Sequence, residues 1–156
     1  MFLRTEIFPR TILAGNSIKM SFADNRSFEL WSGFMPKRKK LANVRRNDLF
    51  SLQTYPKGFD FSDATREFTK WAGAAVNPEA EIPEDFKSIE IPEGKYAVFL
   101  HVGSGQTAAI TFGHIFNHWL PNSGFELDDR PHFEILGAKY KNNDPDSEEE
   151  IFIPIR

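Results

Sequence analysis

The sequence predicts an α+β fold made of two β-α-β-β units. Each half begins with a strand-like segment, continues with an amphipathic helical segment, and ends with further strand-like segments. Phe34-Met35-Pro36 aligns with Trp119-Leu120-Pro121 at an offset of 85 residues, and Leu49-Phe50-Ser51 aligns with His132-Phe133-Glu134 at an offset of 83. A repeat of this length predicts one body with two helices packed on the sheet.

In the first half, residues 11–20 alternate like a strand, and Asp24 and Asn25 are candidate caps for the helix that follows. The expected helix carries Phe28, Trp31, Phe34 and Met35 and ends near Pro36. Residues 49–55 alternate again, and residues 68–76 fit either another strand or part of a short helix.

In the second half, residues 95–103 are strand-like and Gly103-Ser104-Gly105 interrupts them. The expected helix ends at Pro121 and carries Ile110, Phe112, Ile115, Phe116, Trp119 and Leu120. Residues 132–140 and 150–155 are the remaining strands.

The 156 residues predict one domain, residues 1–156. Its first repeat is expected at about 5–76 and its second at about 91–156. The segment of about 77–90, rich in Pro and Glu, links them. A pseudo-twofold arrangement leaves a cleft at the junction, a common place for a ligand. Ser51 is then the repeat equivalent of Glu134, so only one side of the cleft carries the acid.

Nineteen basic and 22 acidic residues give a net charge of −3. This balance argues against a protein that follows nucleic-acid phosphates, so no direct nucleic-acid binding is expected. Lys37-Arg38-Lys39-Lys40 with Arg45-Arg46 is the one basic cluster. This cluster has three possible interpretations: it contacts phosphate, it pairs with the acidic run from Asp144 to Glu150, or it is a solvated helix end.

The chain has no Cys, which excludes disulfides and thiolate chemistry. It has no apolar run of membrane-spanning length, so we expect a cytoplasmic protein without a membrane partner. His114 and His118 have the spacing of metal ligands, but no Glu follows His114 as in zinc proteases. We therefore interpret them as a solvated pair and expect neither a metal nor another cofactor.

Glu134 is the candidate site residue, in a strand-like segment from Arg130 to Gly137. Alternation places it on the same face as His132 and Leu136, opposite Phe133 and Ile135. A carboxylate on a buried face costs several kcal/mol unless it is neutralised, paired or matched by a ligand. The alternative is that Glu134 faces water on a half-exposed strand.

Four blocks of the second half carry a family resemblance: residues 91–99, 119–125, 131–134 and 150–155. In this order they resemble the effector-binding domain of the gyrase-inhibitor-like family, which also follows DNA-binding helices in some bacterial transcription activators of the AraC and MerR types. The resemblance is strong over residues 89–156 and weaker over residues 5–76, where Gly15 contributes.

The resemblance implies an antiparallel sheet and a central ligand cavity in which Glu134 meets lipophilic cations within an aromatic cage. Phe152 corresponds to a position where family members often have Tyr, so a hydrogen-bonding hydroxyl is missing. Some relatives are hydrolases of cyclopropane-containing natural products that use a glutamate and an aromatic side chain. For that activity, Glu134 and Trp119 would be the catalytic pair.

The expected ligand-binding residues combine one charge with several ring faces. Trp119 and Phe152 are expected beside Glu134, with Trp31 and Phe34 on the opposite wall. His132 is expected to orient Glu134 or donate to it. The remaining candidates are Phe112, Phe116, Tyr96, Tyr140, Tyr55 and Trp71.

The function expected first is binding of a small lipophilic molecule, cationic or aromatic, linked to transcription regulation or to sequestration of a drug or toxin. The first alternative is a hydrolase of strained, cyclopropane-type electrophiles in the same pocket. The second is a protein-interaction module, with DNA gyrase or a DNA-binding regulator as partner.

Overall fold

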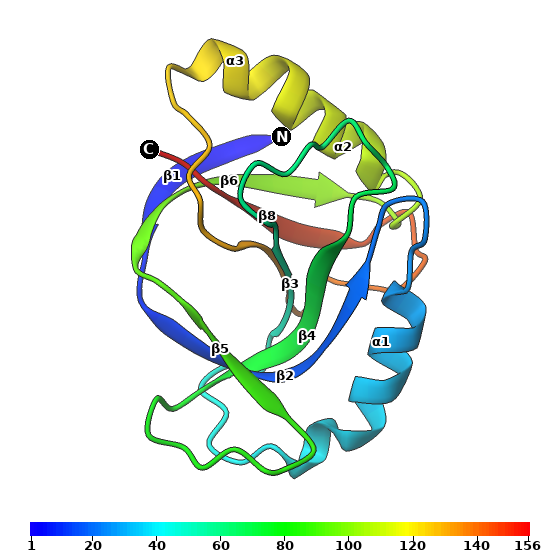
Figure 1. Ribbon diagram of the computed structural model, residues 1–156, viewed down its shortest axis with the longest axis vertical. Helices are drawn as coiled ribbons and strands as arrows, with labels where there is room; N and C mark the ends of the chain where they lie inside the picture. Colours follow the sequence, from blue (N-terminus) through cyan, green and yellow to red (C-terminus); the bar gives the residue numbers. More distant parts are fainter.

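The computed structural model describes all residues from Met1 to Arg156 and contains one antiparallel sheet of eight strands in the order β1-β6-β8-β7-β3-β4-β2-β5 (Figure 1). The strands are β1 (Phe2–Phe8), β2 (Thr11–Met20), β3 (Leu49–Thr54), β4 (Phe68–Val76), β5 (Lys87–Ile91), β6 (Gly94–Val102), β7 (His132–Leu136) and β8 (Glu148–Pro154). The helical segments are α1 (Ser27–Phe34), η1 (Met35–Lys40), α2 (Ala108–His114), η2 (Ile115–Trp119) and α3 (Leu120–Ser123). The predicted α+β fold with duplicated units is confirmed, and the ambiguous segment 68–76 is a strand.

The sheet is symmetric about the contact between β3 and β7. The units β2-α1-β3-β4 and β6-α2-β7-β8 lie on either side of this contact, and their strands follow the same order outward. Ser51 pairs with Glu134 across the contact. The two residues predicted to be repeat equivalents therefore face each other at the pseudo-twofold axis.

Strands β1 and β5 were not expected from the sequence, which placed residues 87–90 in a linker. Each strand leads directly into the first strand of its own repeat but pairs with the first strand of the other repeat. β1 pairs with β6, and β5 pairs with β2. These exchanged arms tie the repeats together and bend the sheet into a curl (Figure 1).

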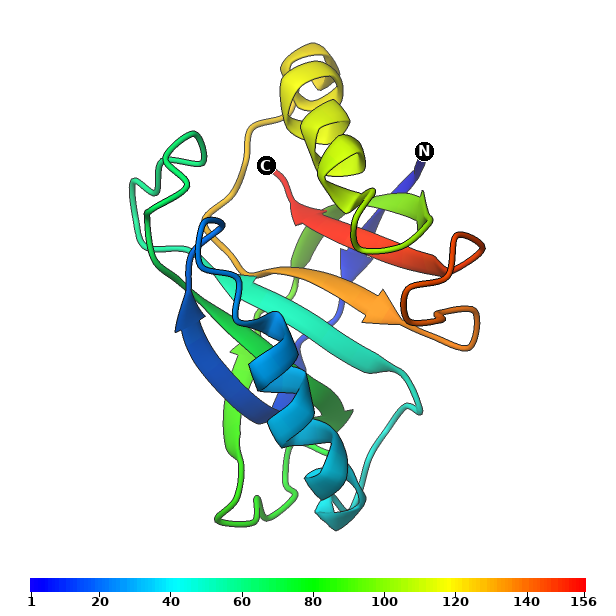
Figure 2. The ribbon, with the colours of Figure 1, turned by 90° about the vertical axis from the view of Figure 1, so that its right-hand side faces the viewer.

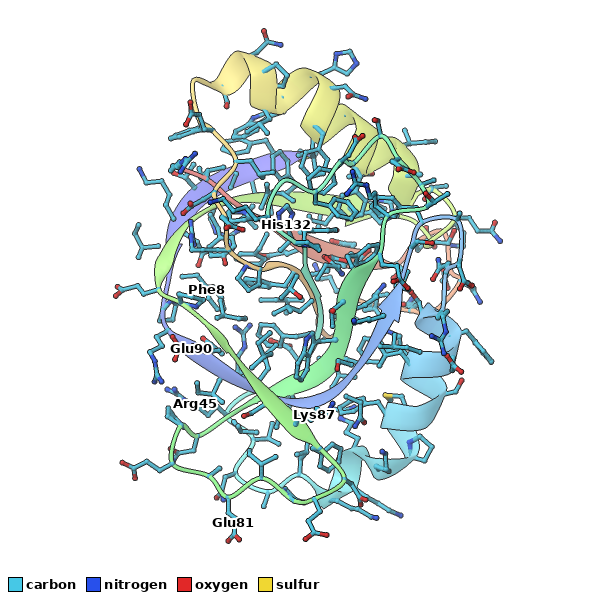
Figure 3. The ribbon with its side chains drawn as sticks, viewed as in Figure 1. Phe8, Arg45, Glu81, Lys87, Glu90 and His132 are labelled. Carbon is cyan, nitrogen blue, oxygen red and sulfur yellow. The ribbon has the colours of Figure 1, made fainter.

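The two faces of the sheet have different partners. One face lines the curl with a cluster of twelve buried residues that includes Phe8, Phe50 and Phe133 (Figure 3). The other face is covered by α1 over β2 and β4, and by α2 with η2 over β6 and β8 (Figure 2). The alternation of each strand assigns its side chains to one face or the other.

The second helical segment continues past Pro121, where the sequence predicted its end. The Leu120 N–H donates to the Ile115 carbonyl five residues earlier, so η2 is a wide π turn. Pro121 then lies in the first turn of α3, where no backbone N–H is needed. The segment ends at Gly124, whose φ is 80°. No helix of the protein is long and apolar enough to cross a membrane.

Gly15 of β2 pairs with Gly73 of β4, and the two strands approach closely there. A methyl group on Gly15 would overlap the Ala72 carbonyl oxygen. We expect Gly15→Ala to lower the free energy of unfolding by about 1–3 kcal/mol, because backbone atoms cannot yield like a flexible side chain. Urea unfolding followed by tryptophan fluorescence measures this loss.

Gly33→Ala is the matched control, because a methyl group on Gly33 of α1 meets nothing within 4 Å. Alanine in a helix interior should instead add roughly 0.5–1 kcal/mol. Equal effects of the two substitutions would contradict the close approach at Gly15.

Candidate functional site

Glu134 lies at the centre of the sheet, on the face that carries the two helical segments. Its neighbours across the ladder are Ser51 of β3 and Ile151 of β8, and Ile151 packs in the cluster beneath α2. The side chain is buried, with only 8% of the residue exposed. The predicted face is confirmed, and the alternative of a water-facing carboxylate is excluded.

The Glu134 carboxyl group is only partly satisfied by hydrogen bonds. Gln53 Nε2 donates to Oε1 at 3.3 Å and also lies 3.4 Å from Ser51 Oγ. Glu134 Oε2 is buried and has no hydrogen-bond partner. Burying a polar atom without a hydrogen-bond partner costs free energy, so we expect this oxygen to bind a proton or a group of a ligand.

Burial raises the pKa of Glu134 to about 8, because desolvation disfavours the charged form. Glu149 pushes the pKa further up, while Lys70 and the hydrogen bond from Gln53 oppose the rise. The pKa of Glu149 is itself raised by burial, against the opposing influence of His101 and Lys70. At neutral pH, Glu134 is therefore mostly protonated.

Lys70 and Glu149 occupy equivalent positions in the two repeats. Lys70 lies two residues before Ala72, which pairs with Ser51. Glu149 lies two residues before Ile151, which pairs with Glu134. Lys70 Nζ donates to Ser27 Oγ of α1 at 2.9 Å. The two repeats thus place a basic and an acidic side chain on either side of Glu134.

Glu149 pairs across the ladder with His101 of β6. His101 is buried, and its Nε2 lies 3.1 Å from the Ser104 carbonyl oxygen, which can only accept. The Nε2 atom is therefore the protonated one, and Nδ1 faces Thr111 Oγ1 at 2.7 Å. These bonds fix His101 beside Glu149 and beneath α2.

His132 lies on the same face as Glu134, as predicted, and is buried. Burial and the charge of Arg130 lower its pKa to about 3, so the ring is neutral. The His132 ring centroid lies 4.9 Å from that of Tyr55 and 6.2 Å from that of Phe116. Burial and the charge of Glu134 raise the pKa of Tyr55. His132 therefore joins the acid to an aromatic wall.

This wall, called here the aromatic cluster, comprises Phe22, Tyr55, Phe59, Phe61, Phe68 and Phe116. The Phe61 ring stacks on Phe116 at a centroid distance of 5.5 Å. The contact joins the β3–β4 connection of the first repeat to the helical segment of the second. Phe59 and Phe61 were not expected here, although two Phe in a turn-rich segment beside a candidate ligand residue, Tyr55, are a usable signal.

Four predicted lining residues pack in the hydrophobic clusters beneath the two helical segments. Trp119 packs against Phe2, Phe99 and Phe125, over β6, and β8 lies between β6 and the strand of Glu134. Phe112 belongs to the same hydrophobic cluster as Trp119. Trp31 and Phe34 pack against each other under α1. None of these four belongs to the aromatic cluster.

Four other predicted residues lie elsewhere. Phe152 is on the opposite face of the sheet, where its ring stacks on Phe133 at 4.7 Å. Tyr96 also faces the curl, and its hydroxyl donates to the Pro131 carbonyl oxygen at 3.0 Å. Trp71 belongs to the same curl cluster. Tyr140 lies in the β7–β8 connection and is 38% exposed.

The surface has two hollows of about 500 Å³ each, besides smaller ones, and Glu134 lines neither of these two. One lies beside η1. The other lies at the mouth of the curl, on the far face of the sheet, and includes Arg4, Phe8 and Phe152. Because Glu134 is buried, a ligand that reaches its carboxyl group must displace side chains that cover it.

Comparison with known proteins assigns the chain to a family. Residues 51–156 match the GyrI-like small molecule binding domain. The chain belongs to this family, and it is a small-molecule binding domain.

A relative with assigned function is the transcriptional regulator BrlR of Pseudomonas aeruginosa, which is 29% identical over 128 residues. The match covers 81% of this chain but 45% of BrlR, so the chain spans less than half of that relative.

Two solved structures share the fold over 100% of this chain. SAV2435 bound to tetraphenylphosphonium superposes with a TM-score of 0.75 at 14% identity, over 94% of its length. The EcmrR C-terminal domain superposes with a TM-score of 0.72 at 13% identity, over 98% of its length.

The raised pKa of Glu134 predicts a pH-dependent stability. The folded protein holds this proton more tightly than the unfolded chain, whose Glu pKa is near 4.5. The resulting stabilisation is fully present below about pH 4.5 and is lost as the pH rises through about 8. Between these values, wild type should lose about 2–4 kcal/mol relative to Glu134→Gln.

Urea unfolding of both proteins across this pH range makes the comparison. Glu149 also has a raised pKa, but it is present in both proteins and cancels in the difference. Parallel pH curves would mean that Glu134 ionises freely in the folded protein.

Proposed function

We propose that this domain binds a lipophilic organic cation between its two helical segments, with the Glu134 carboxylate as the charge partner. The observation that carries the proposal is the buried Oε2 atom without a hydrogen-bond partner, in a carboxyl group whose pKa lies near 8. A cation that replaces the proton compensates the carboxylate in a low dielectric. A neutral ligand of the same shape gains no such interaction.

The aromatic cluster supplies the ring faces of the proposed site. Tyr55 and Phe116 both contact His132, which neighbours Glu134 on its strand. Flat cations bind such faces through cation–π attraction, which adds about 0.5–2 kcal/mol for each ring. The Phe61–Phe116 stack closes the way in from this side, so we propose that the β3–β4 connection moves when the ligand enters.

The relatives support a role in regulation. BrlR is a transcriptional regulator, and SAV2435 binds tetraphenylphosphonium. We propose that the domain senses a small molecule and acts with a DNA-binding regulator, in which case the cation is an effector. Sequestration of the cation uses the same site and needs no partner.

Hydrolysis of a strained electrophile is the second candidate function. It is favoured by the same carboxyl group, which is mostly protonated at neutral pH and therefore suited to act as a general acid. Trp119 packs over β6, so Tyr55 or His132 would stand beside the reacting carbon instead. Mass spectrometry of the bound molecule separates a converted ligand from an intact one.

Glu134→Gln tests the charge partner. Binding of tetraphenylphosphonium should weaken by about thirtyfold or more, because the substitution leaves a buried cation unpaired. Binding of neutral triphenylphosphine oxide should change little. Calorimetry and tryptophan quenching measure both affinities. Glu126→Gln is the control, because the Glu126 side chain is 76% exposed.

Proton release gives an independent readout. Glu134 is protonated in the free protein at pH 7, so binding of the cation should release close to one proton in wild type and none in the Gln variant. Calorimetry in buffers of different ionisation enthalpy measures the release. If Glu134→Gln weakened binding of the cation and of the oxide equally, Glu134 would not be the charge partner of the ligand. The proposal of a binding pocket would be unaffected.

Lys70 should act against the proposed cation, since it carries a like charge near Glu134. Lys70→Met is expected to strengthen tetraphenylphosphonium binding by about three- to tenfold, and Glu149→Gln to weaken it by a similar factor. Lys19→Met is the control, because Lys19 is an exposed residue of β2. Unchanged affinities in both site variants would mean that these charges do not reach the ligand.

A further inference from the structure

A hollow of about 500 Å³ lies beside the C-terminal end of α1, away from Glu134. Its lining includes Met35, Arg38, Lys39, Leu41, Val44 and Ala74. This end of α1 points away from α2, toward the opposite end of the molecule (Figure 2). The hollow therefore shares no wall with the proposed cation site.

The lining contains two basic residues and no acid. Arg38 and Lys39 form no salt bridge, whereas the nearby acids Asp85 and Asp48 already pair with Lys40 and Arg46 at 2.8 and 2.6 Å. The alternative that the basic cluster pairs with the run from Asp144 to Glu150 is wrong, because its partners are these two aspartates. A chain with a net charge of −3 thus carries a local positive patch.

Arg45 adds a further positive charge at this end of the molecule, well away from His132 (Figure 3). It forms no salt bridge. Its backbone N–H donates to the Ala75 carbonyl oxygen at 2.9 Å, and Val44 forms a bridge with Val76. The basic segment is therefore tied to β4 rather than loose.

Arg38 is held in place for binding. Its Nη2 donates to the Asn47 carbonyl oxygen at 3.0 Å, and its other N–H groups have no partner in the protein. A guanidinium fixed in this way can offer a pair of N–H groups to one planar anion without a large loss of side-chain freedom. Lys39 is exposed, and its Nζ is a second donor.

The rest of the hollow is apolar. Leu41 is buried and Ala74 is 2% exposed, whereas Met35 and Val44 remain 45% and 41% exposed. Apolar surface beside unpaired cations fits a molecule that has both an anionic group and a hydrocarbon or aromatic body. Nucleic-acid phosphates need no such apolar floor.

We propose that this hollow binds a small amphipathic organic anion, such as a carboxylate, sulfonate or phosphate monoester with an apolar body. Arg38 and Lys39 contact the anionic group, while Met35, Leu41 and Val44 contact the apolar body. The domain then has two sites of opposite charge preference, one between the helical segments and one at the end of α1.

The test compares two fluorescent probes with one ring system, the anion 1-anilinonaphthalene-8-sulfonate and the neutral N-phenyl-1-naphthylamine. Wild type should bind the sulfonate at one site and at least about fivefold more tightly than the neutral probe. Lys39→Glu and Arg38→Gln should each weaken sulfonate binding by about two- to fivefold. Saturation with tetraphenylphosphonium should leave sulfonate binding in place.

Lys141→Glu is the matched control, because Lys141 is exposed, lies in the β7–β8 connection and carries the same charge change. It should leave the sulfonate affinity unchanged, and circular dichroism checks that every variant is folded. Equal binding of both probes, no effect of the two site variants, or displacement by tetraphenylphosphonium would each overturn the proposal. The proposal would also be overturned if double-stranded DNA bound through the same residues and the sulfonate did not bind.

Discussion

The pairing of β3 with β7 fixes a buried carboxyl group at the centre of the sheet, and the site follows from this constraint. Hydrogen bonds of the ladder hold the backbone of Glu134 opposite Ser51. Strands continue on both sides and helical segments lie over the outer strands of the same face, so the side chain is largely shielded from solvent. Its charge is governed by its surroundings: Gln53 bonds one oxygen, and the other stays without a partner.

A symmetric fold carries an asymmetric site. The two repeats superpose in strand order, yet Ser51 faces Glu134 across the axis, and Lys70 occupies the position equivalent to Glu149. The duplicated units provide the same strand framework on both sides of the site. The residues that differ between the repeats make the site electrostatically asymmetric. The aromatic cluster is asymmetric as well, because its β3–β4 connection reaches over to Phe116 of the other repeat.

What the sequence predicted well depends on local patterns. Alternation within one strand placed His132 and Glu134 on one face, and the repeat offset paired Ser51 with Glu134. The aromatic cluster depends on distant contacts, and only Tyr55 and Phe116 of its members were among the predicted residues. The register between β7 and β8 pairs Ile151 with Glu134, and this places Phe152 on the opposite face of the sheet. A short segment of sequence does not reveal that register. Similarly, the partner of Phe116 is Phe61, which lies in a connection without regular structure.

The exchanged arms make the two halves of the chain interdependent during folding. The pairs between β1 and β6 join residues from 86 positions apart (Phe8 and Gly94) to 97 positions apart (Phe2 and Phe99). During synthesis, β1 leaves the ribosome long before its partner exists, and β2 waits for β5 in the same way. Such non-local pairing slows folding and favours a single cooperative transition. Until β6 is made, the apolar side chains of Phe2, Leu3 and Phe8 lie on an unpaired strand, which is the state in which this domain is most exposed to aggregation.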